Sequence, residues 1–494
     1  MIRPLRSVSL LMLALFGALF VNLNYLQVVR ARDLASDPRN SRGLIEEYEI
    51  RRGAIFAADE TTQIAHSEET EGLLRFQRIY DDGPLYAHVS GFYSFIYGRS
   101  QLELAMNSYL VGSAPEVFAR NLADLLSGQE RRGDVVITTI RPDVQRAAAE
   151  ALGDRAGAVV ALNPRSGEIL ALVSSPSYDP NVLASHERSV VVDYWEQTES
   201  DPANPRLSRA ANELYPPGST FKLVTAAAAL EAGMTPEEEF GDPPALDLPQ
   251  TDAAIRNFGG GLCNGGQPIT LRRALEMSCN TTFGAIGLEL GSEALIAKAE
   301  DFGLNREWEF QLPHATSRIP KELDPPQTAQ SAIGQRDVRV TPLQMAMITA
   351  AIANDGVLVT PRVVAKVEDF AGRIIRQFPP GEPLRLPGAS DAQAVDRLAA
   401  AALRDMMVGV VQSGSGQRAA IDGVTVAGKT GTAQTGEGRP PTVWFVGFAP
   451  VEDPQVAVAV VVEDGGDVGD EATGGRVAAP IARAALQAAL APQE

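Results

Sequence analysis

The stretch Tyr215-Pro216-Pro217-Gly218-Ser219-Thr220-Phe221-Lys222 places a serine and a lysine three residues apart at the start of a predicted helix. The residues that follow, Leu223–Ala232, are apolar and rich in alanine, and Gly233 ends the run, which is typical of a helix buried on most of its faces. We therefore expect Ser219 at the helix N-terminus and Lys222 one turn further along the same face. In an apolar setting such an amine can take the proton of a serine hydroxyl.

The Ser-x-x-Lys pattern by itself also has a simpler interpretation. A serine at this position often caps the helix, and a lysine often extends its charged end to solvent. Two further polar motifs later in the chain favour the catalytic interpretation.

The second motif is Ser278-Cys279-Asn280, which lies between the helix-like segments Leu271–Met277 and Thr281–Leu290. In a tight turn, the hydroxyl of Ser278 and the amide of Asn280 can face the same cleft. The hydroxyl would relay a proton, and the amide would hold a peptide bond. Taken alone, the tripeptide favours an ordinary polar junction between helices.

The third motif is Lys429-Thr430-Gly431-Thr432, at the end of the strand-like run Val424–Thr432. Gly431 allows another segment of backbone to approach the strand closely. Residues 423–430 also match the phosphate-loop pattern Gly-x-x-x-x-Gly-Lys-Thr. A phosphate loop must curl and lead into a helix. The Val-Thr-Val in the middle of this segment favours extended backbone, and no helix start follows, so the context argues against nucleotide binding.

Composition argues against nucleic-acid binding and against a metal site. The chain has 494 residues, enough for two or three domains, and its formal net charge of −19 argues against nucleic acid as a partner. The two cysteines and four scattered histidines make a metal site unexpected, and we expect no metal and no cofactor.

The N-terminus predicts a membrane anchor. No charged residue occurs from Ser7 to Val29, which is long enough to span a bilayer. The apolar run continues past the length of a signal peptide without a small-residue cleavage site, which favours an uncleaved single-pass anchor.

The rest of the chain divides at about residue 152. Residues 1–29 form the expected cytoplasmic tail and anchor, residues 30–152 an elongated non-catalytic pedestal, and residues 153–494 a catalytic domain. A hairpin is predicted over 158–173, strands over 424–432, 443–449 and 455–462, and a final helix over 477–490. Strands at both ends with helices between them predict an α+β fold, in which one sheet assembled from both ends is flanked by helices.

Ser-x-x-Lys, Ser-x-Asn and Lys-Thr-Gly, in this order, are the signature of penicillin-binding proteins and related serine enzymes. The chain resembles a class B penicillin-binding protein, most closely the actinobacterial penicillin-binding protein A group, over nearly its whole length. Further similar segments are Arg52–Ile55, Gly98–Glu103, Asn163–Ala171, Thr341–Met345 and Trp444–Phe448. The one departure is Cys279, where the usual pattern has an aspartate; its side chain is not expected to take part in chemistry.

The resemblance implies the penicillin-binding transpeptidase fold, with an antiparallel sheet flanked by helices. It also implies a peptidoglycan D,D-transpeptidase that cross-links stem peptides ending in D-Ala-D-Ala and is acylated by β-lactams. Ser219 would be the nucleophile, Lys222 the proton acceptor and Ser278 the proton relay. The backbone N–H groups of Ser219 and Thr432 would form the oxyanion hole. The substrate would be bound by Asn280, Lys429, Thr430, Gly431 and Thr432.

The resemblance further implies a catalytic domain outside the membrane, and a polytopic polymerase as the partner that makes the glycan strands. Alternatives are a β-lactamase, which is normally shorter and lacks an anchor, and a β-lactam sensor, which needs a cytoplasmic signalling domain. A non-catalytic division scaffold is a further alternative, although it would be expected to have lost motif residues. The sequence leaves open whether the enzyme serves septation or elongation.

The two cysteines, Cys263 and Cys279, lie close together in the sequence, with Asn264-Gly265-Gly266 giving the chain freedom to return. An oxidising compartment outside the membrane would favour a disulfide between them. The alternative is a pair of unpaired buried thiols.

Overall fold

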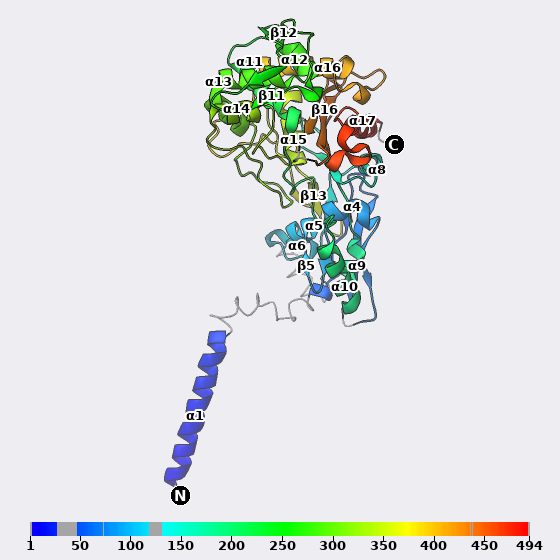
Figure 1. Cartoon of the computed structure of the whole chain (residues 1–494). Helices are drawn as coiled ribbons and strands as arrows, with labels where there is room; N and C mark the ends of the chain where they lie inside the picture. The colour runs from blue at the N-terminus through cyan, green and yellow to red at the C-terminus, as the bar shows by residue number, and fades with distance from the viewer. Residues whose placement is uncertain are drawn as a thin grey trace.

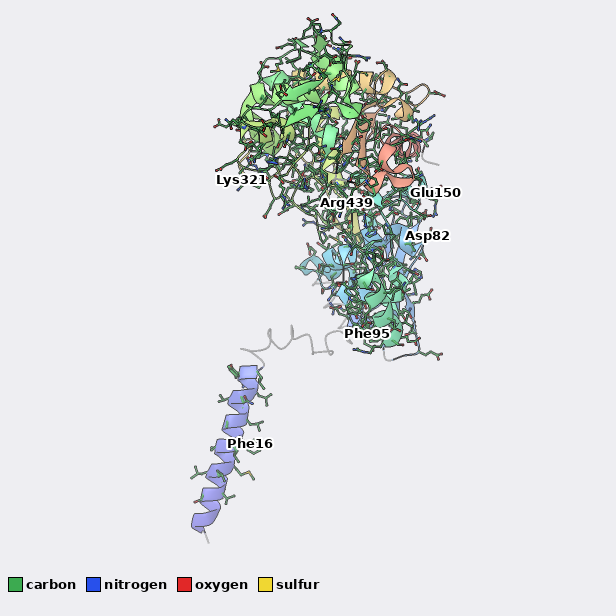
Figure 2. The ribbon with its side chains drawn as sticks, viewed as in Figure 1. Phe16, Asp82, Phe95, Glu150, Lys321 and Arg439 are labelled. Atoms are coloured by element: carbon green, nitrogen blue, oxygen red, sulfur yellow. A yellow bond between two sulfur atoms is a disulfide. The ribbon has the colours of Figure 1, made fainter. Side chains whose placement is uncertain are left out.

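The structure, a computed structural model, describes residues 2–26, 47–72, 74–117, 131–434, 436 and 438–492, with only the backbone for residues 2–6. Helix α1 (Ile2–Asn24) contains the segment Ser7–Asn24, which is long and apolar enough to cross a membrane. None of that segment, which includes Phe16 (Figure 2), is buried against the rest of the chain. The expected span reached Val29, and residues 27–29 lie outside the described ranges.

A six-stranded sheet forms the pedestal, in the strand order β14-β13-β6-β1-β2-β3. Its N-terminal strands are β1 (Ile55–Phe56), β2 (Gln63–Glu69), β3 (Phe76–Tyr80) and β6 (Val135–Thr138). The other two, β13 (Val364–Glu368) and β14 (Ile374–Gln377), come from the C-terminal half of the chain. Strand β6 pairs in parallel with β1 and antiparallel with β13, so it joins the two contributions.

Short helices surround this sheet below the catalytic domain (Figure 1). They are α4 (Gly83–Ser90), α5 (Gln101–Ala105), α6 (Asn107–Leu110), α9 (Pro180–Ala184) and α10 (Arg188–Ser200), and a small hairpin joins β4 (Tyr93–Ser94) to β5 (Gly98–Arg99). Met106 separates α5 from α6, and β1 is regular over two residues only.

The pedestal is therefore not the contiguous segment 30–152 that the sequence predicted. It takes up residues 180–200 and 364–377 from beyond that boundary. Conversely, helix α8 (Pro142–Leu152) lies within the predicted pedestal segment but packs on the catalytic domain. Its residues Val144, Ala148 and Leu152 share a core with the C-terminal helix. Strand pairing between distant segments leaves no local pattern from which this exchange could be predicted.

The catalytic domain is built on a five-stranded antiparallel sheet in the order β15-β16-β17-β7-β8. The strands are β7 (Gly157–Leu162), β8 (Ile169–Ser175), β15 (Ala427–Ala433), β16 (Thr442–Ala449) and β17 (Val456–Val462). Strand β17 from the C-terminal part pairs with β7. The prediction of one sheet assembled from both ends of the domain is confirmed.

Both faces of this sheet are covered, which explains why β7, β16 and β17 are buried at every position. Helices α8 and α17 (Ala478–Leu490) cover one face. The other face packs against α15 (Pro342–Ala353) and a helical region that includes α11 (Lys222–Glu231), α12 (Leu271–Met277), α13 (Asn280–Asp301), α14 (Pro325–Ala332) and α16 (Arg397–Gln412). Short strands β9 (Glu239–Phe240) and β12 (Ile269–Thr270) pair with each other, as do β10 (Ala245–Asp247) and β11 (Ala254–Arg256).

Candidate active site

The segment with Ser219 forms a single turn of 3-10 helix, η3 (Gly218–Phe221), that continues into α11. The turn is fixed by two contacts from outside: the Gly218 N–H donates to Gly334 O at 2.9 Å, and Trp444 Nε1 donates to Pro216 O at 3.0 Å. Gly218 has a φ of +52°, a left-handed conformation that favours glycine. Ser219 is thus held at the start of the helix, as the sequence predicted.

Lys222 lies in the first turn of α11 and is fully buried. Its Nζ donates to Ser278 O at 2.7 Å and to Asn280 Oδ1 at 2.8 Å, and it also contacts Ser278 Oγ at 3.3 Å. All three partners belong to the turn Ser278-Cys279-Asn280, which connects α12 to α13. The structure therefore joins the first and second sequence motifs through the lysine.

The third motif lies on the edge strand β15, beside η3. Lys429, also fully buried, donates from Nζ to Ser278 Oγ at 2.8 Å and to Thr430 O at 2.9 Å. Ser278 itself has a φ of +64°, which ends α12 and turns its side chain toward the two lysines. One hydroxyl thus links all three motifs.

The backbone of β15 lies against the turn with Ser219. A Cβ added to Gly218 would lie 2.9 Å from the carbonyl oxygen and 3.0 Å from the carbonyl carbon of Thr432, so the backbone of β15 approaches the turn closely here. A Cβ at Gly431 would lie 3.0 Å from Pro217 O, which confirms that this glycine permits the close approach.

Burial controls the charge of both lysines. It lowers the pKa of Lys222 well below its ordinary value of 10.5, and the charge of the neighbouring Lys429 lowers it further. Burial also lowers the pKa of Lys429 to about 7. Lys429 therefore titrates near neutrality, and its charged form disfavours a proton on Lys222.

A cleft of about 1330 Å³ opens at this junction. It is lined by Ser219, Ser278, Asn280, Thr430 and Thr432, while Lys222 and Lys429 lie beneath its floor. Its charged lining residues are three arginines, Arg256, Arg336 and Arg439, and one carboxylate, Asp470. Five of the predicted site residues therefore line one solvent-accessible groove.

Among the polar residues of this cleft that the sequence did not identify, Ser415 and Asn257 contact motif residues. Ser415, in the turn after α16, shares a hydrogen bond of 2.6 Å with Thr430. Asn257, which follows β11, accepts hydrogen bonds from the backbone N–H groups of Asn280 and Thr281 at 2.8 and 3.1 Å. Neither occurs in a recognisable motif, and only the fold places them beside motif residues.

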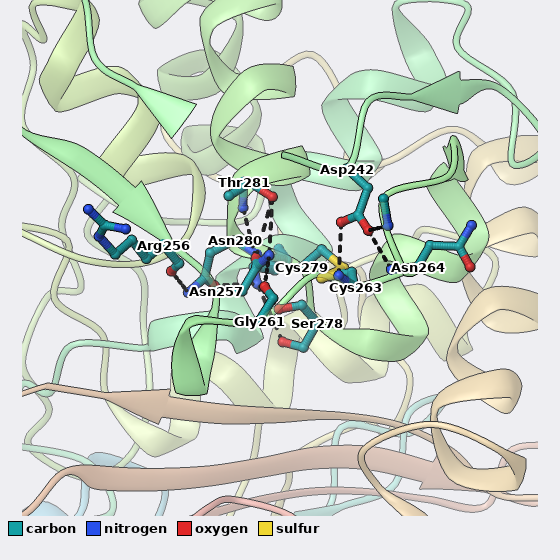
Figure 3. The surroundings of a disulfide bond; sticks show 12 residues. Asp242, Arg256, Asn257, Gly261, Cys263, Asn264, Ser278, Cys279, Asn280 and Thr281 are labelled. Carbon is teal, nitrogen blue, oxygen red and sulfur yellow. Dashed lines mark hydrogen bonds between the residues drawn. A yellow bond between two sulfur atoms is a disulfide. The ribbon is translucent and has the colours of Figure 1, made fainter. Parts of the chain in front are cut away.

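The structure joins Cys263 and Cys279 in a disulfide (Figure 3). Cys279 is the middle residue of the second motif, so the bond ties that turn to the preceding loop. Asp242 fixes the same loop by accepting from the N–H groups of Cys263, Asn264 and Gly266.

The extended backbone of β15 is not that of a phosphate loop. Lys429 and Thr430 lie within a regular extended strand that pairs along its length with β16. A strand presents no ring of N–H groups to a phosphate, so the match to the nucleotide-binding pattern is coincidental. Across the described ranges, no group of three or more His, Cys, Asp or Glu residues could hold a metal ion.

Two family models match the chain. The penicillin-binding protein transpeptidase domain matches residues 157–487, and the penicillin-binding protein A dimerisation domain matches residues 52–136. Among curated relatives, the peptidoglycan D,D-transpeptidase PbpA of Mycolicibacterium smegmatis is 43% identical, with 98% of each chain covered. PbpA of Mycobacterium tuberculosis is 42% identical, again with 98% of each chain covered.

Solved structures share the fold over most of the chain. An acyl-enzyme complex of penicillin-binding protein A from M. tuberculosis has a TM-score of 0.86 at 42% identity, covering 90% of this chain and 100% of the other. The penicillin G acyl-enzyme complex of the same protein gives 0.83 at 41% identity, with the same coverage.

Proposed function

The chain belongs to the penicillin-binding protein transpeptidase family and is a class B peptidoglycan D,D-transpeptidase, and we propose that Ser219 is the nucleophile of its acyl-enzyme. The observation that carries this assignment is the junction of three motifs at the Ser278 hydroxyl, beside the turn with Ser219. Ser219 attacks the carbonyl of the penultimate D-Ala of a stem peptide, and the terminal D-Ala leaves.

Lys222 takes the proton of Ser219. The role needs a neutral amine, and complete burial together with the nearby Lys429 favours that form by lowering the pKa of Lys222. Ser278 then passes the proton to the departing amine, since its hydroxyl contacts both lysines. In the second half of the reaction the acceptor amine attacks the acyl-enzyme, and its proton moves through Ser278 to Lys222.

The strand edge binds the substrate. Thr430 and Thr432 line the cleft and offer hydroxyls to the terminal carboxylate, and charged Lys429 attracts that carboxylate from below. The N–H groups of Ser219 and Thr432 form the oxyanion hole, and the close approach of Thr432 to the turn at Gly218 supports this assignment. Gly431 keeps strand and turn close, and Asn280 holds the donor peptide.

Helix α1 anchors the chain in the cell membrane as a single-pass protein, with the catalytic domain on the outer side, where peptidoglycan is assembled. Its apolar segment Ser7–Asn24 supports this role. Glycan polymerisation falls to a polytopic membrane polymerase working beside this chain. The two matched families, over residues 52–136 and 157–487, are a dimerisation and a transpeptidase family rather than a polymerase family.

Mass spectrometry tests the nucleophile. After incubation with penicillin G, the intact protein is expected to gain the mass of one penicillin, and peptide mapping to place it on Ser219. The adduct should persist, because a transpeptidase acyl-enzyme is resolved by an amine acceptor rather than by water. Folded Ser219→Ala protein should gain nothing. An adduct on another residue would refute the assignment, and rapid release of hydrolysed penicillin would favour a β-lactamase.

A further inference from the structure

Helix α13 begins at a cap residue that makes no side-chain hydrogen bond. Cys279 occupies the N-cap position, and its sulfur is bonded to Cys263. The first N–H groups of a helix need an acceptor, which an N-cap side chain usually provides. Here the first residue of the helix is Asn280, which is in the site and contacts Lys222.

Asn257 supplies the missing acceptor from another part of the chain. Its Oδ1 accepts from the N–H groups of Asn280 at 2.8 Å and of Thr281 at 3.1 Å, and its Nδ2 donates to Gly261 O at 3.1 Å. The side chain is 8% exposed, so water does not readily replace these bonds. Figure 3 shows Asn257 between its own loop and the start of the helix.

The neighbouring residue makes a second connection. The carbonyl oxygen of Arg256 accepts from Asn280 Nδ2 at 2.9 Å, while Oδ1 of the same amide accepts from Lys222. The orientation of the Asn280 amide is therefore set at both ends. Together with the disulfide, residues 256–263 form a strap that is attached to the Ser278–Asn280 turn at Asn257, at Arg256 and at Cys263.

We infer that Asn257 is a positioning residue of the transpeptidase: by capping α13 in place of Cys279, it holds Asn280 and Ser278 in register with the two lysines. This inference rests on the proposed function, in which Lys222 and Ser278 move the proton. Loss of the cap lets the turn shift, so that Lys222 loses its hydrogen-bond partners. The acylation step slows, whereas penicillin binding to the strand edge is affected little.

Two substitutions separate positioning from general destabilisation. Asn257→Leu keeps the approximate size and removes the acceptor, and Asn257→Asp keeps an acceptor oxygen and adds a negative charge. Asn264→Leu is the matched control, because Asn264 lies at the far end of the loop and donates to Asp242 and Pro268 rather than to the turn. The measurements are the acylation rate constant and the apparent penicillin dissociation constant at several pH values, with thermal unfolding of each variant.

We expect Asn257→Leu to reduce the acylation rate constant at least tenfold with a dissociation constant within about threefold of wild type, and Asn264→Leu to leave both unchanged. Asn257→Asp should retain acylation. The rise of its acylation rate constant with pH should move to higher pH, because the new carboxylate stabilises protonated Lys222. The inference is wrong if Asn257→Leu is acylated as fast as wild type. It is also wrong if Asn257→Asp loses acylation while the pH dependence of its acylation rate constant stays unchanged. Failure of the wild-type protein to be acylated at Ser219 would instead refute the proposed function.

If Asn257→Leu does not fold, the pH profile of Asn257→Asp decides the question alone. A profile identical to that of wild type then contradicts the inference, and a shift to higher pH supports it.

Discussion

Lys222 and Lys429 bind the same hydroxyl. Their Nζ atoms lie 3.3 and 2.8 Å from Ser278 Oγ, and both side chains are fully buried. Two cations so close together repel each other, and burial disfavours charge on either of them. The pair is therefore suited to share a proton through the hydroxyl, with Lys222 neutral and Lys429 charged when an anionic substrate is bound.

Substitution by arginine should affect acylation differently at Lys222 and at Lys429. Lys222→Arg should reduce penicillin acylation by at least 10³-fold, because a guanidinium does not lose its proton near neutral pH. Lys429→Arg should retain more activity, since a positive charge remains beneath the carboxylate site. Stopped-flow acylation with one penicillin measures both. Equal acylation by Lys222→Arg and wild type would exclude Lys222 as the base and make Ser278 the next candidate.

The pH dependence of acylation should show a fall near neutrality. In the proposed mechanism acylation needs neutral Lys222, so the rate rises with pH as Lys222 loses its proton. It also needs charged Lys429, whose pKa of about 7 means that the charge is lost as pH increases through that value. The second-order acylation constant, which reports the free enzyme, should therefore decline above about pH 7.

Lys429→Arg provides the control for this decline, because arginine stays protonated throughout the range. In that variant the high-pH fall should disappear. A decline that persists in Lys429→Arg would assign it to another group.

The disulfide should be required for full activity and stability. Unfolded, non-reduced protein from the cell envelope should contain no free thiol at Cys263 or Cys279. The double variant Cys263→Ser/Cys279→Ser should lose about 3 kcal/mol of stability on the chain-entropy model. It should also acylate more slowly, because the strap loses one of its attachments to the catalytic turn. Two thiols titrated per chain would rule out the bond in the natural compartment.

The pedestal should depend on one buried carboxylate. Glu103 accepts from Arg52 Nε at 2.5 Å and from Arg78 Nε at 2.6 Å, and all three side chains are buried. Glu103→Gln leaves the two guanidinium groups without a countercharge and should cost roughly 3 kcal/mol or more. The urea unfolding midpoint measures this loss, with the exposed Glu49→Gln as control. Penicillin acylation of the folded variant should be unchanged, and a coupled loss would show that the pedestal supports catalysis.

Local patterns of sequence predicted much of this protein. The three motifs, the apolar runs of β7, β16 and β17 and the Ala-rich helices each have a signature in their own residues. Burial on both faces favours continuous apolar strands, and a buried helix favours alanine, so these elements follow from composition and periodicity. The site residues could be named in the same way, because a serine, a lysine and a turn in a fixed order are features of the chain itself.

The tertiary structure decided what those residues contact. Lys222 was expected to share a helical face with Ser219, and the fold brings its hydrogen-bond partners Ser278 and Asn280 from the turn between α12 and α13. Asn257 became part of the site only because β11 ends beside α13, and the pedestal sheet is completed by strands from residues 364–377. The lowered pKa values of the two lysines also come from burial by distant segments. Sequence patterns specify each element through interactions between near neighbours, whereas partners, burial and charge state depend on segments that meet only when the chain has folded.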